Sequence, residues 1–240
     1  MTTAAKEPIS AAVVAAVDVY WLPLGAGGHS VRWNGRVFEA LVAAREHRPP
    51  QDLYHSALVV RVPAGRFVIE MTPIPDGNGA RRGVVGEGPV GTRWAGRLRL
   101  FRYELRCWRG GSIPDLAYAV GGPCRVSADP RLARRVLALT AAVPRPVWGR
   151  DELGAGEMWN SNSVVAWLLE RSGVGTDAAA PPAGGRAPGW TAGVCAAGRD
   201  PLPSHGLPLL ALGAMFAFME KKLPGSWASL IAVSRLSRSP

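Results

Sequence analysis

The chain has 240 residues, 48% of them hydrophobic, and a formal net charge of +10. This length fits one large domain or one domain with an appendage, and the apolar fraction suffices to fill a core. Arginine supplies nearly all of the positive charge and accompanies a high Ala, Gly and Pro content, so the charge identifies no single partner, although a basic surface favours anionic ones.

The three cysteines, Cys107, Cys124 and Cys195, match no zinc or redox spacing, and their odd number argues against a disulfide framework. We therefore predict a reducing, cytoplasmic setting. No metal-ligand spacing and no cofactor motif is visible, so we predict neither. No apolar run reaches the roughly 18 residues that a membrane span needs, and the apolar run at residues 9–24 is interpreted as a first buried strand rather than a signal peptide.

Composition divides the chain into a loose leader (1–13), a domain (14–198) and a C-terminal appendage (199–240), which we expect to be flexible or amphipathic. Within the appendage, residues 207–223 are apolar and end at Lys221 and Lys222. Such a segment could rest on a membrane surface. We favour the alternative, in which it packs on the domain or has no fixed structure.

The first half of the domain is predicted to consist mainly of strands. Residues 16–22 form the first strand, and 36–40 form a second one within a segment that has room for a helical turn. Residues 55–62 and 66–72 form a hairpin around Pro63-Ala64-Gly65. The glycine-rich residues 76–91 are expected to form a long surface loop.

The second half mixes one strand with two helices. Residues 97–108 alternate between apolar and charged side chains, which predicts a half-buried strand; we interpret its charged face as solvated rather than as a nucleic-acid interface. Asp129 and Pro130 begin a helix that ends before Pro144, and a second helix extends from near Asn160 to Gly173. Residues 176–187 form a loop, and 190–197 are expected to be a short last strand.

Ser161 is the first candidate for chemistry, because it lies in the first turn of the second helix. Backbone N–H groups point outward there and can stabilise a developing oxyanion. The alternative is that Asn160 or Ser161 is an ordinary N-cap. His55 is the second candidate, on a strand whose two faces both look buried. Its imidazole could face a cleft, or it could be a hydrogen-bonded core histidine.

The order of these segments resembles the circularly permuted papain-like fold, which includes the PPPDE (deSUMOylase-like) peptidases and the lecithin retinol acyltransferase-like proteins. In those families an early strand carries the general-base histidine in a Tyr-His-Ser/Thr setting, which Tyr54-His55-Ser56 matches here. A later helix opens with the nucleophile, often as Asn-Cys-Asn, which corresponds to Asn160-Ser161-Asn162. The resemblance covers roughly residues 14–197. It implies an α+β fold with an antiparallel sheet packed against two main helices.

The resemblance also implies acyl-group hydrolysis or transfer at an amide or ester, with Ser161 attacking and His55 taking its proton. Ser161 stands where the family has cysteine. A hydroxyl is not ionised near neutral pH, whereas a thiol with a pKa of about 8.5 partly is. The chain is therefore either a serine-nucleophile hydrolase or acyltransferase, or a non-catalytic domain. In the second case it would bind a ligand or protein partner in the cleft that corresponds to the active site of the family. The substrate, a small molecule or a peptide, is not indicated, and no specific nucleic acid is expected.

A third group should orient the histidine, and Glu70 is the available acid. A turn centred on Ala64 would place Pro73 opposite His55, leaving Glu70 roughly 10 Å along the strand, with Thr72 as a closer but weaker alternative. Asn160 and Asn162 are predicted to supply amide donors to an oxyanion.

Overall fold

The computed structural model describes residues 14–25, 39–74, 83–113 and 115–199. These residues build one mainly antiparallel sheet in the order β4-β5-β3-β2-β1-β6, with β7 paired in parallel to the start of β2. The strands are β1 Ala16–Pro23, β2 Asp52–Val62, β3 Gly65–Pro73, β4 Val84–Pro89, β5 Arg102–Arg109, β6 Cys124–Ser127 and β7 Gly185–Arg186.

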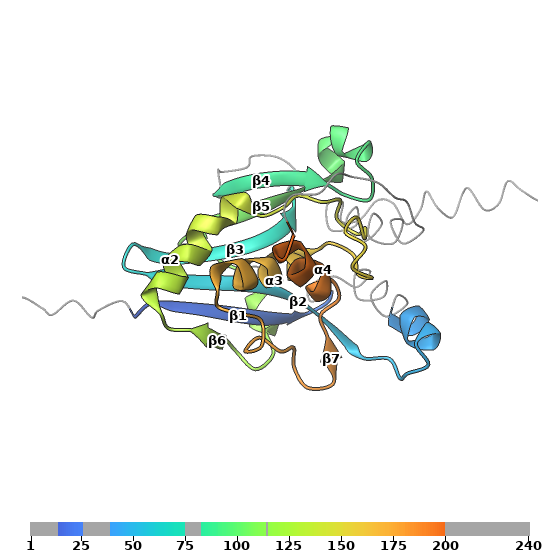
Figure 1. Ribbon diagram of the computed structural model, residues 1–240, viewed down its shortest axis with the longest axis horizontal. Coiled ribbons are helices and arrows are strands. Elements are labelled where there is room, and N and C mark those ends of the chain that lie inside the picture. The colour runs from blue at the N-terminus through green and yellow to red at the C-terminus, as the bar shows by residue number, and fades with distance from the viewer. Residues whose placement is uncertain (1–13, 26–38, 75–82, 114, 200–240) are drawn as a thin grey trace, which may run out of the picture.

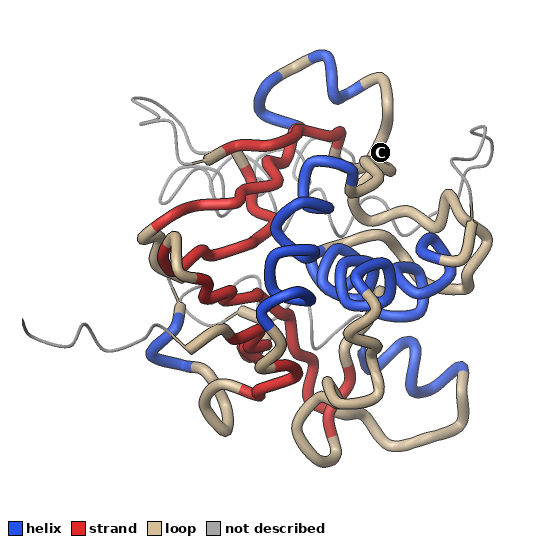
Figure 2. Tube along the Cα trace, turned by 60° about the vertical axis from the view of Figure 1, so that its left-hand side comes forward, coloured by secondary structure: helices blue, strands red, loops and turns tan. Residues whose placement is uncertain are grey.

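Three helices cover one face of this sheet, as Figures 1 and 2 show. They are α2 Pro130–Leu139, α3 Ser161–Ser172 and α4 Trp190–Ala197, with short 3₁₀ turns η1 Ala95–Arg97, η2 Arg99–Phe101, η3 Leu116–Tyr118 and η4 Thr140–Ala142. The predicted α+β class with an antiparallel sheet is confirmed.

The two long helices begin and end where the sequence predicts. Asp129 caps α2 by accepting a hydrogen bond from the Arg131 backbone N–H at 2.6 Å, and Pro130 occupies the first helical position. α3 ends at Gly173, whose positive φ of 80° suits a residue without a Cβ.

The core is divided between the two faces of the sheet. The larger cluster joins the helix-facing side chains of β1, β2 and β3 to α2, α3 and α4, and the smaller cluster lies on the opposite face around Leu22, Ala57 and Val68. β1 and β2 are therefore apolar on both faces, as expected for central strands. Each strand consequently has a fixed register, since a one-residue slip would exchange its two buried faces.

Some local predictions need correction and others fall outside the described residues. Residues 39 and 40 are not strand but begin a helical segment that extends to residue 45, in the part of the chain where the sequence has room for a helical turn. Residues 84–89 form the edge strand β4 rather than loop, and 190–197 form α4 rather than a strand. The remainder of the predicted strand (36–38), the loop residues 76–82, the leader and the appendage from residue 200 on lie outside the described residues.

α4 is a helix because its small residues allow close packing on α3. A Cβ built on Gly193 would lie 2.2 Å from the Ser163 carbonyl oxygen and 2.8 Å from the Ala166 side chain. The segment lacks the alternation of a half-buried strand, and its apolar side chains are buried where α4 packs on α3.

The charged face of β5 is buried at Glu104 and Arg106, not solvated as predicted, whereas Arg102 is 38% exposed. Arg106 bonds the Glu104 carboxylate at 2.8 Å and the Glu70 carboxylate of β3 at 3.3 Å, and all three side chains are at most 12% exposed. Alternation identified the two faces of β5 correctly, but it does not reveal whether a charged face is covered. Two carboxylates sharing one guanidinium satisfy the requirement that buried charges be paired.

Cys107, Cys124 and Cys195 are free thiols. Among the described residues, no helix is long and apolar enough to cross a bilayer.

Candidate active site

The N-terminus of α3 is capped by Asn160, not by Ser161. The Asn160 side-chain oxygen accepts hydrogen bonds from the backbone N–H groups of Asn162 (2.9 Å) and Ser163 (3.4 Å). The Ser163 hydroxyl accepts one in return from the Asn160 backbone N–H, which completes a capping box. Ser161 is thus the first helical residue, with a side chain that has no capping role.

Ser161 is a buried residue of this helix end. It is 9% exposed, and its hydroxyl makes no hydrogen bond within the described part of the chain. A hydroxyl without a capping role keeps its donor and acceptor capacity for a reacting group.

The two sequence motifs meet at what we call the β2–α3 junction, which consists of residues 54–56 and 160–163. The Ser56 hydroxyl donates to the Asn162 side-chain oxygen at 2.8 Å, and the Asn162 side-chain nitrogen donates to the Tyr54 carbonyl at 2.9 Å. The residues on either side of His55 therefore both bond to the residue that follows Ser161.

The Tyr54 carbonyl is available because β3 does not pair with this part of β2. Successive carbonyls of a strand point in opposite directions, and that of Leu53 accepts from the Leu24 N–H on the β1 side. The Tyr54 carbonyl therefore points toward β3, but pairing between β2 and β3 ends at Leu58. Asn162 provides the hydrogen bond that a neighbouring strand would otherwise provide.

The turn before α4 closes the junction from the other side. The side-chain nitrogens of Asn160 and Asn162 both donate to the Pro188 carbonyl, at 2.8 and 2.9 Å, and the Ser163 hydroxyl donates to the Gly189 carbonyl at 2.6 Å. Gly189 has a positive φ of 89°, and a Cβ there would lie 2.5 Å from the Asn160 side chain. Only glycine fits this contact.

These bonds revise the expected oxyanion donors. Asn162 has two amide hydrogens, and the Tyr54 and Pro188 carbonyls take both of them. In this structure Asn162 therefore has no amide hydrogen left for the predicted oxyanion, and its side chain joins β2 to α3. Asn160 uses one amide hydrogen for Pro188, so its second hydrogen is still compatible with the predicted role.

His55 lies half-buried in β2, next to the β1 residue Leu22 in the antiparallel register. Leu22 and Ala57 belong to the core cluster on the face away from the helices, whereas Ser56 contacts α3. Strand alternation therefore assigns His55 to the face opposite α3. The sequence correctly predicts that both faces of this strand are buried.

Glu70 shares that face. The hairpin turn consists of Pro63 and Ala64, so Leu58 pairs with Ile69. Continuing this register brings Thr72, not Pro73, level with His55. In this extended register Glu70 is two residues from the position level with His55 and on the same sheet face, although β2 and β3 are no longer paired there. Arg106 bonds the Glu70 carboxylate, and Thr72 lies opposite Glu104 on β5.

Sequence reasoning did not identify Ser56 and Ser163 as structural partners of the candidate site. The spacing of Asn160 and Ser163 matches a capping box, so the contact between these two residues could have been predicted from the sequence. The contact of Ser56 with Asn162 joins positions 106 residues apart, and no local pattern predicts it.

Within the residues that the structure describes, no group of three or more His, Cys, Asp or Glu side chains could hold a metal ion. Comparison of the chain with protein-family models, with curated proteins and with solved structures finds no match.

Proposed function

We propose that the chain is an acyl-group hydrolase or transferase of the permuted papain-like type, with Ser161 as nucleophile and His55 as general base. The observation that carries this proposal is the β2–α3 junction, where Asn162 bonds to both neighbours of His55 while the adjacent Ser161 hydroxyl has no capping role. In the proposed step the Ser161 oxygen attacks an ester or amide carbonyl as its proton passes to His55. The proton then moves to the leaving group, and water releases the acyl group.

The oxyanion would form at the start of α3. The backbone N–H groups of Asn162 and Ser163 are held by the Asn160 cap, so the Ser161 N–H and the second amide hydrogen of Asn160 are the proposed donors. Glu70 is proposed to orient His55 from the same sheet face, with Arg106 fixing its carboxylate.

A second candidate, a non-catalytic domain that binds a ligand or protein partner at the junction, is favoured by one observation. The β1–β2 register assigns His55 to the sheet face opposite α3. Proton transfer requires the imidazole to come within hydrogen-bond reach of the Ser161 hydroxyl, about 2.6–3.2 Å. If His55 stays on its own face, Ser161 lacks a base.

A thiol probe separates the two candidates without knowledge of the substrate. Ser161→Cys places a thiol at the helix start, and the pH dependence of its alkylation by iodoacetamide, resolved by mass spectrometry, gives its pKa. Ser112→Cys, in an exposed loop, is the matched control. A catalytic pair predicts a thiol pKa at least one unit below the ordinary value of about 8.5, and a return toward it when His55→Ala is added.

The other outcomes have distinct meanings. A lowered thiol pKa that His55→Ala leaves unchanged supports the binding candidate, because the helix end alone then accounts for it. A pKa equal to that of the Ser112→Cys control contradicts the catalytic proposal. Labelling of the natural chain by a fluorophosphonate at Ser161, abolished by Ser161→Ala and reduced by His55→Ala, is the positive test.

A further inference from the structure

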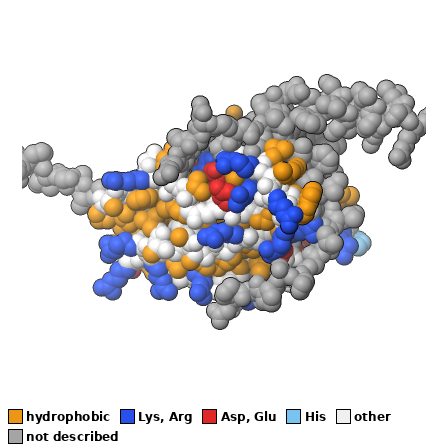
Figure 3. Space-filling model, turned by 90° about the horizontal axis from the view of Figure 1, so that it is seen from above, with side chains coloured by type: hydrophobic (Ala, Val, Ile, Leu, Met, Phe, Trp, Pro, Cys, Tyr) orange, Lys and Arg blue, Asp and Glu red, His pale blue; other side chains and the backbone are white. Residues whose placement is uncertain are grey.

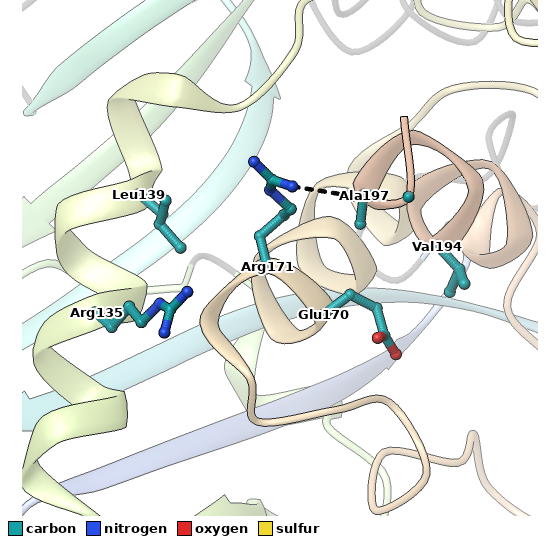
Figure 4. A pocket seen from close by; sticks show the side chains of 7 residues that line it. Arg135, Leu139, Glu170, Arg171, Val194 and Ala197 are labelled. Atoms are coloured by element: carbon teal, nitrogen blue, oxygen red, sulfur yellow. Dashed lines mark hydrogen bonds between the residues drawn. The ribbon is translucent and has the colours of Figure 1, made fainter. Parts of the chain in front are cut away.

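A pocket of about 480 Å³ opens between the three helices, at the end of α3 away from the junction. Figure 4 shows its lining, with Arg135 and Leu139 from α2, Glu170 and Arg171 from α3, and Val194 and Ala197 from α4. Ten residues of helix separate Ser161 from Arg171, which at 1.5 Å per residue is about 15 Å. The pocket is therefore distinct from the candidate active site.

Two guanidinium groups face this pocket without an acid between them. Arg171 donates to the Ala197 carbonyl at 3.3 Å, and Arg135 has no ion-pair partner among the described residues. Glu170, the only acid of the lining, is turned away in Figure 4, and its carboxylate accepts from the Thr176 backbone N–H (3.1 Å) and hydroxyl (2.6 Å). The pocket thus has an uncompensated positive charge.

α2 extends this positive charge along its outer side. Arg131, Arg134 and Arg135 are all exposed, the helix has no acidic residue, and none of the three side chains forms an ion pair with a described residue. In the view of Figure 3, arginine side chains are scattered over the face, and acidic side chains are few and gather near its middle. By contrast, Arg48, Arg61 and Arg106 each bond to carboxylates elsewhere in the fold.

Aliphatic side chains line the pocket from two sides. Leu139 lines it from α2, Val194 and Ala197 line it from α4, and no aromatic side chain is among its lining residues. Single-stranded nucleic acid binding relies on aromatic side chains for base stacking, so this lining fits a nucleic acid poorly. It fits a peptide in which an acidic side chain neighbours an aliphatic one, since guanidinium groups bind carboxylates through paired hydrogen bonds.

We infer that the pocket between α2, α3 and α4 is a docking site for an acidic segment of a protein partner, with Arg135 as its main charged contact and Val194 as its apolar contact. The carboxylate lies between the Arg135 and Arg171 guanidinium groups, and the neighbouring aliphatic side chain lies against Val194. This inference does not depend on the proposed catalytic function.

The test uses the full chain and a fluorescein-labelled twelve-residue peptide of mixed Glu and Leu, followed by fluorescence anisotropy at 150 mM salt. The control peptide has Gln in place of every Glu. We expect the Gln peptide to bind at least tenfold more weakly. Arg135→Gln should weaken the Glu peptide at least fivefold, whereas Arg134→Gln, which removes the same charge from the next position of α2, should weaken it less than twofold.

Val194→Thr tests the proposed apolar contact, because it changes a methyl group to a hydroxyl at nearly constant volume. We expect at least threefold weaker binding, with an unchanged melting temperature to show that the fold is intact. Equal losses for Arg134→Gln and Arg135→Gln would overturn the inference in favour of diffuse charge attraction. Absence of binding, or tighter binding of a twelve-nucleotide poly-uridine RNA that also depends on Arg135, would overturn it as well.

Discussion

The Ser56 hydroxyl and the Asn162 amide oxygen lie 2.8 Å apart, although 106 positions separate them in the chain. This hydrogen bond, with that from Asn162 to the Tyr54 carbonyl, joins the strand that carries His55 to the helix that begins at Ser161. In the proposed acyl transfer the nucleophile and the base would come from distant parts of the sequence, and this hydrogen bond is one of those that fix the position of their two elements relative to each other.

Asn162→Ala should destabilise the protein by about 3 kcal/mol, because it leaves the buried Ser56 hydroxyl and Tyr54 carbonyl without partners. Ser56→Ala leaves only the Asn162 oxygen unpaired, and should cost about 1 kcal/mol. Urea unfolding of both variants measures the difference. A Ser56→Ala variant as unstable as Asn162→Ala would show that Asn162 does not hold the junction.

Local patterns predicted those parts of the fold that local physics determines. Asp129 and Pro130 marked the start of α2, and Pro63 with Ala64 marked the hairpin turn, because caps and turns depend on residues a few positions apart. Apolar runs predicted residues 16–22 of β1 and residues 55–62 of β2, although β2 begins earlier, at Asp52.

The rest depended on tertiary context. α4 was taken for a strand because its small apolar residues fit either element, and only its close packing on Ser163 determines which one forms. The burial of Glu104 and Arg106 depends on what covers their face of the sheet, which alternation does not show. The second role of Asn162 could not be predicted either, since a helix-start asparagine is usually explained by capping.

The buried carboxylate of Asp18 predicts a non-additive response to arginine removal. Asp18 is fully buried in β1 and bonds to both Arg61 and Arg125, and the bond to Asp18 raises the pKa of Arg125. Arg125→Ala alone should cost about 1 kcal/mol, because Arg61 still pairs with the carboxylate. The double variant leaves a buried charge unpaired and should cost about 3–5 kcal/mol. Additive losses in chemical denaturation would contradict this account.

Glu39 predicts how stability depends on pH. Burial acts to raise its pKa, but hydrogen bonds from Arg48 and the Gln51 backbone N–H outweigh this, and the folded pKa lies below the ordinary value of 4.5. A lowered folded pKa contributes stability that is present above pH 4.5 and is lost as the pH falls through the folded pKa. The stability difference between the natural chain and Glu39→Gln should therefore be largest near pH 7 and shrink below pH 4.5.

Glu46→Gln is the matched control for this measurement, because Glu46 bonds to the same Arg48 from a side chain that is 46% exposed. Solvent screens such a pair, so we expect little change in stability at any pH. Urea midpoints of the three proteins across the acid range provide the comparison. A pH-independent difference for Glu39→Gln would exclude the carboxylate charge as its cause.

Gly193 tests whether α4 must approach α3 as closely as the structure has it. In an ordinary helix, Gly→Ala gains about 1 kcal/mol from helix propensity. At Gly193 the added methyl would lie 2.2 Å from the Ser163 carbonyl oxygen, so we expect a net loss of about 1–3 kcal/mol from overpacking. Gly198→Ala, at the end of the same helix, meets only the Cys195 carbonyl at 3.8 Å and should be neutral or slightly stabilising. Thermal melting of the two variants separates the effects. Equal melting temperatures would mean that α4 lies farther from α3 than the structure has it. The hydrogen bond from the Ser163 hydroxyl to the Gly189 carbonyl would then not hold the start of α3 in place.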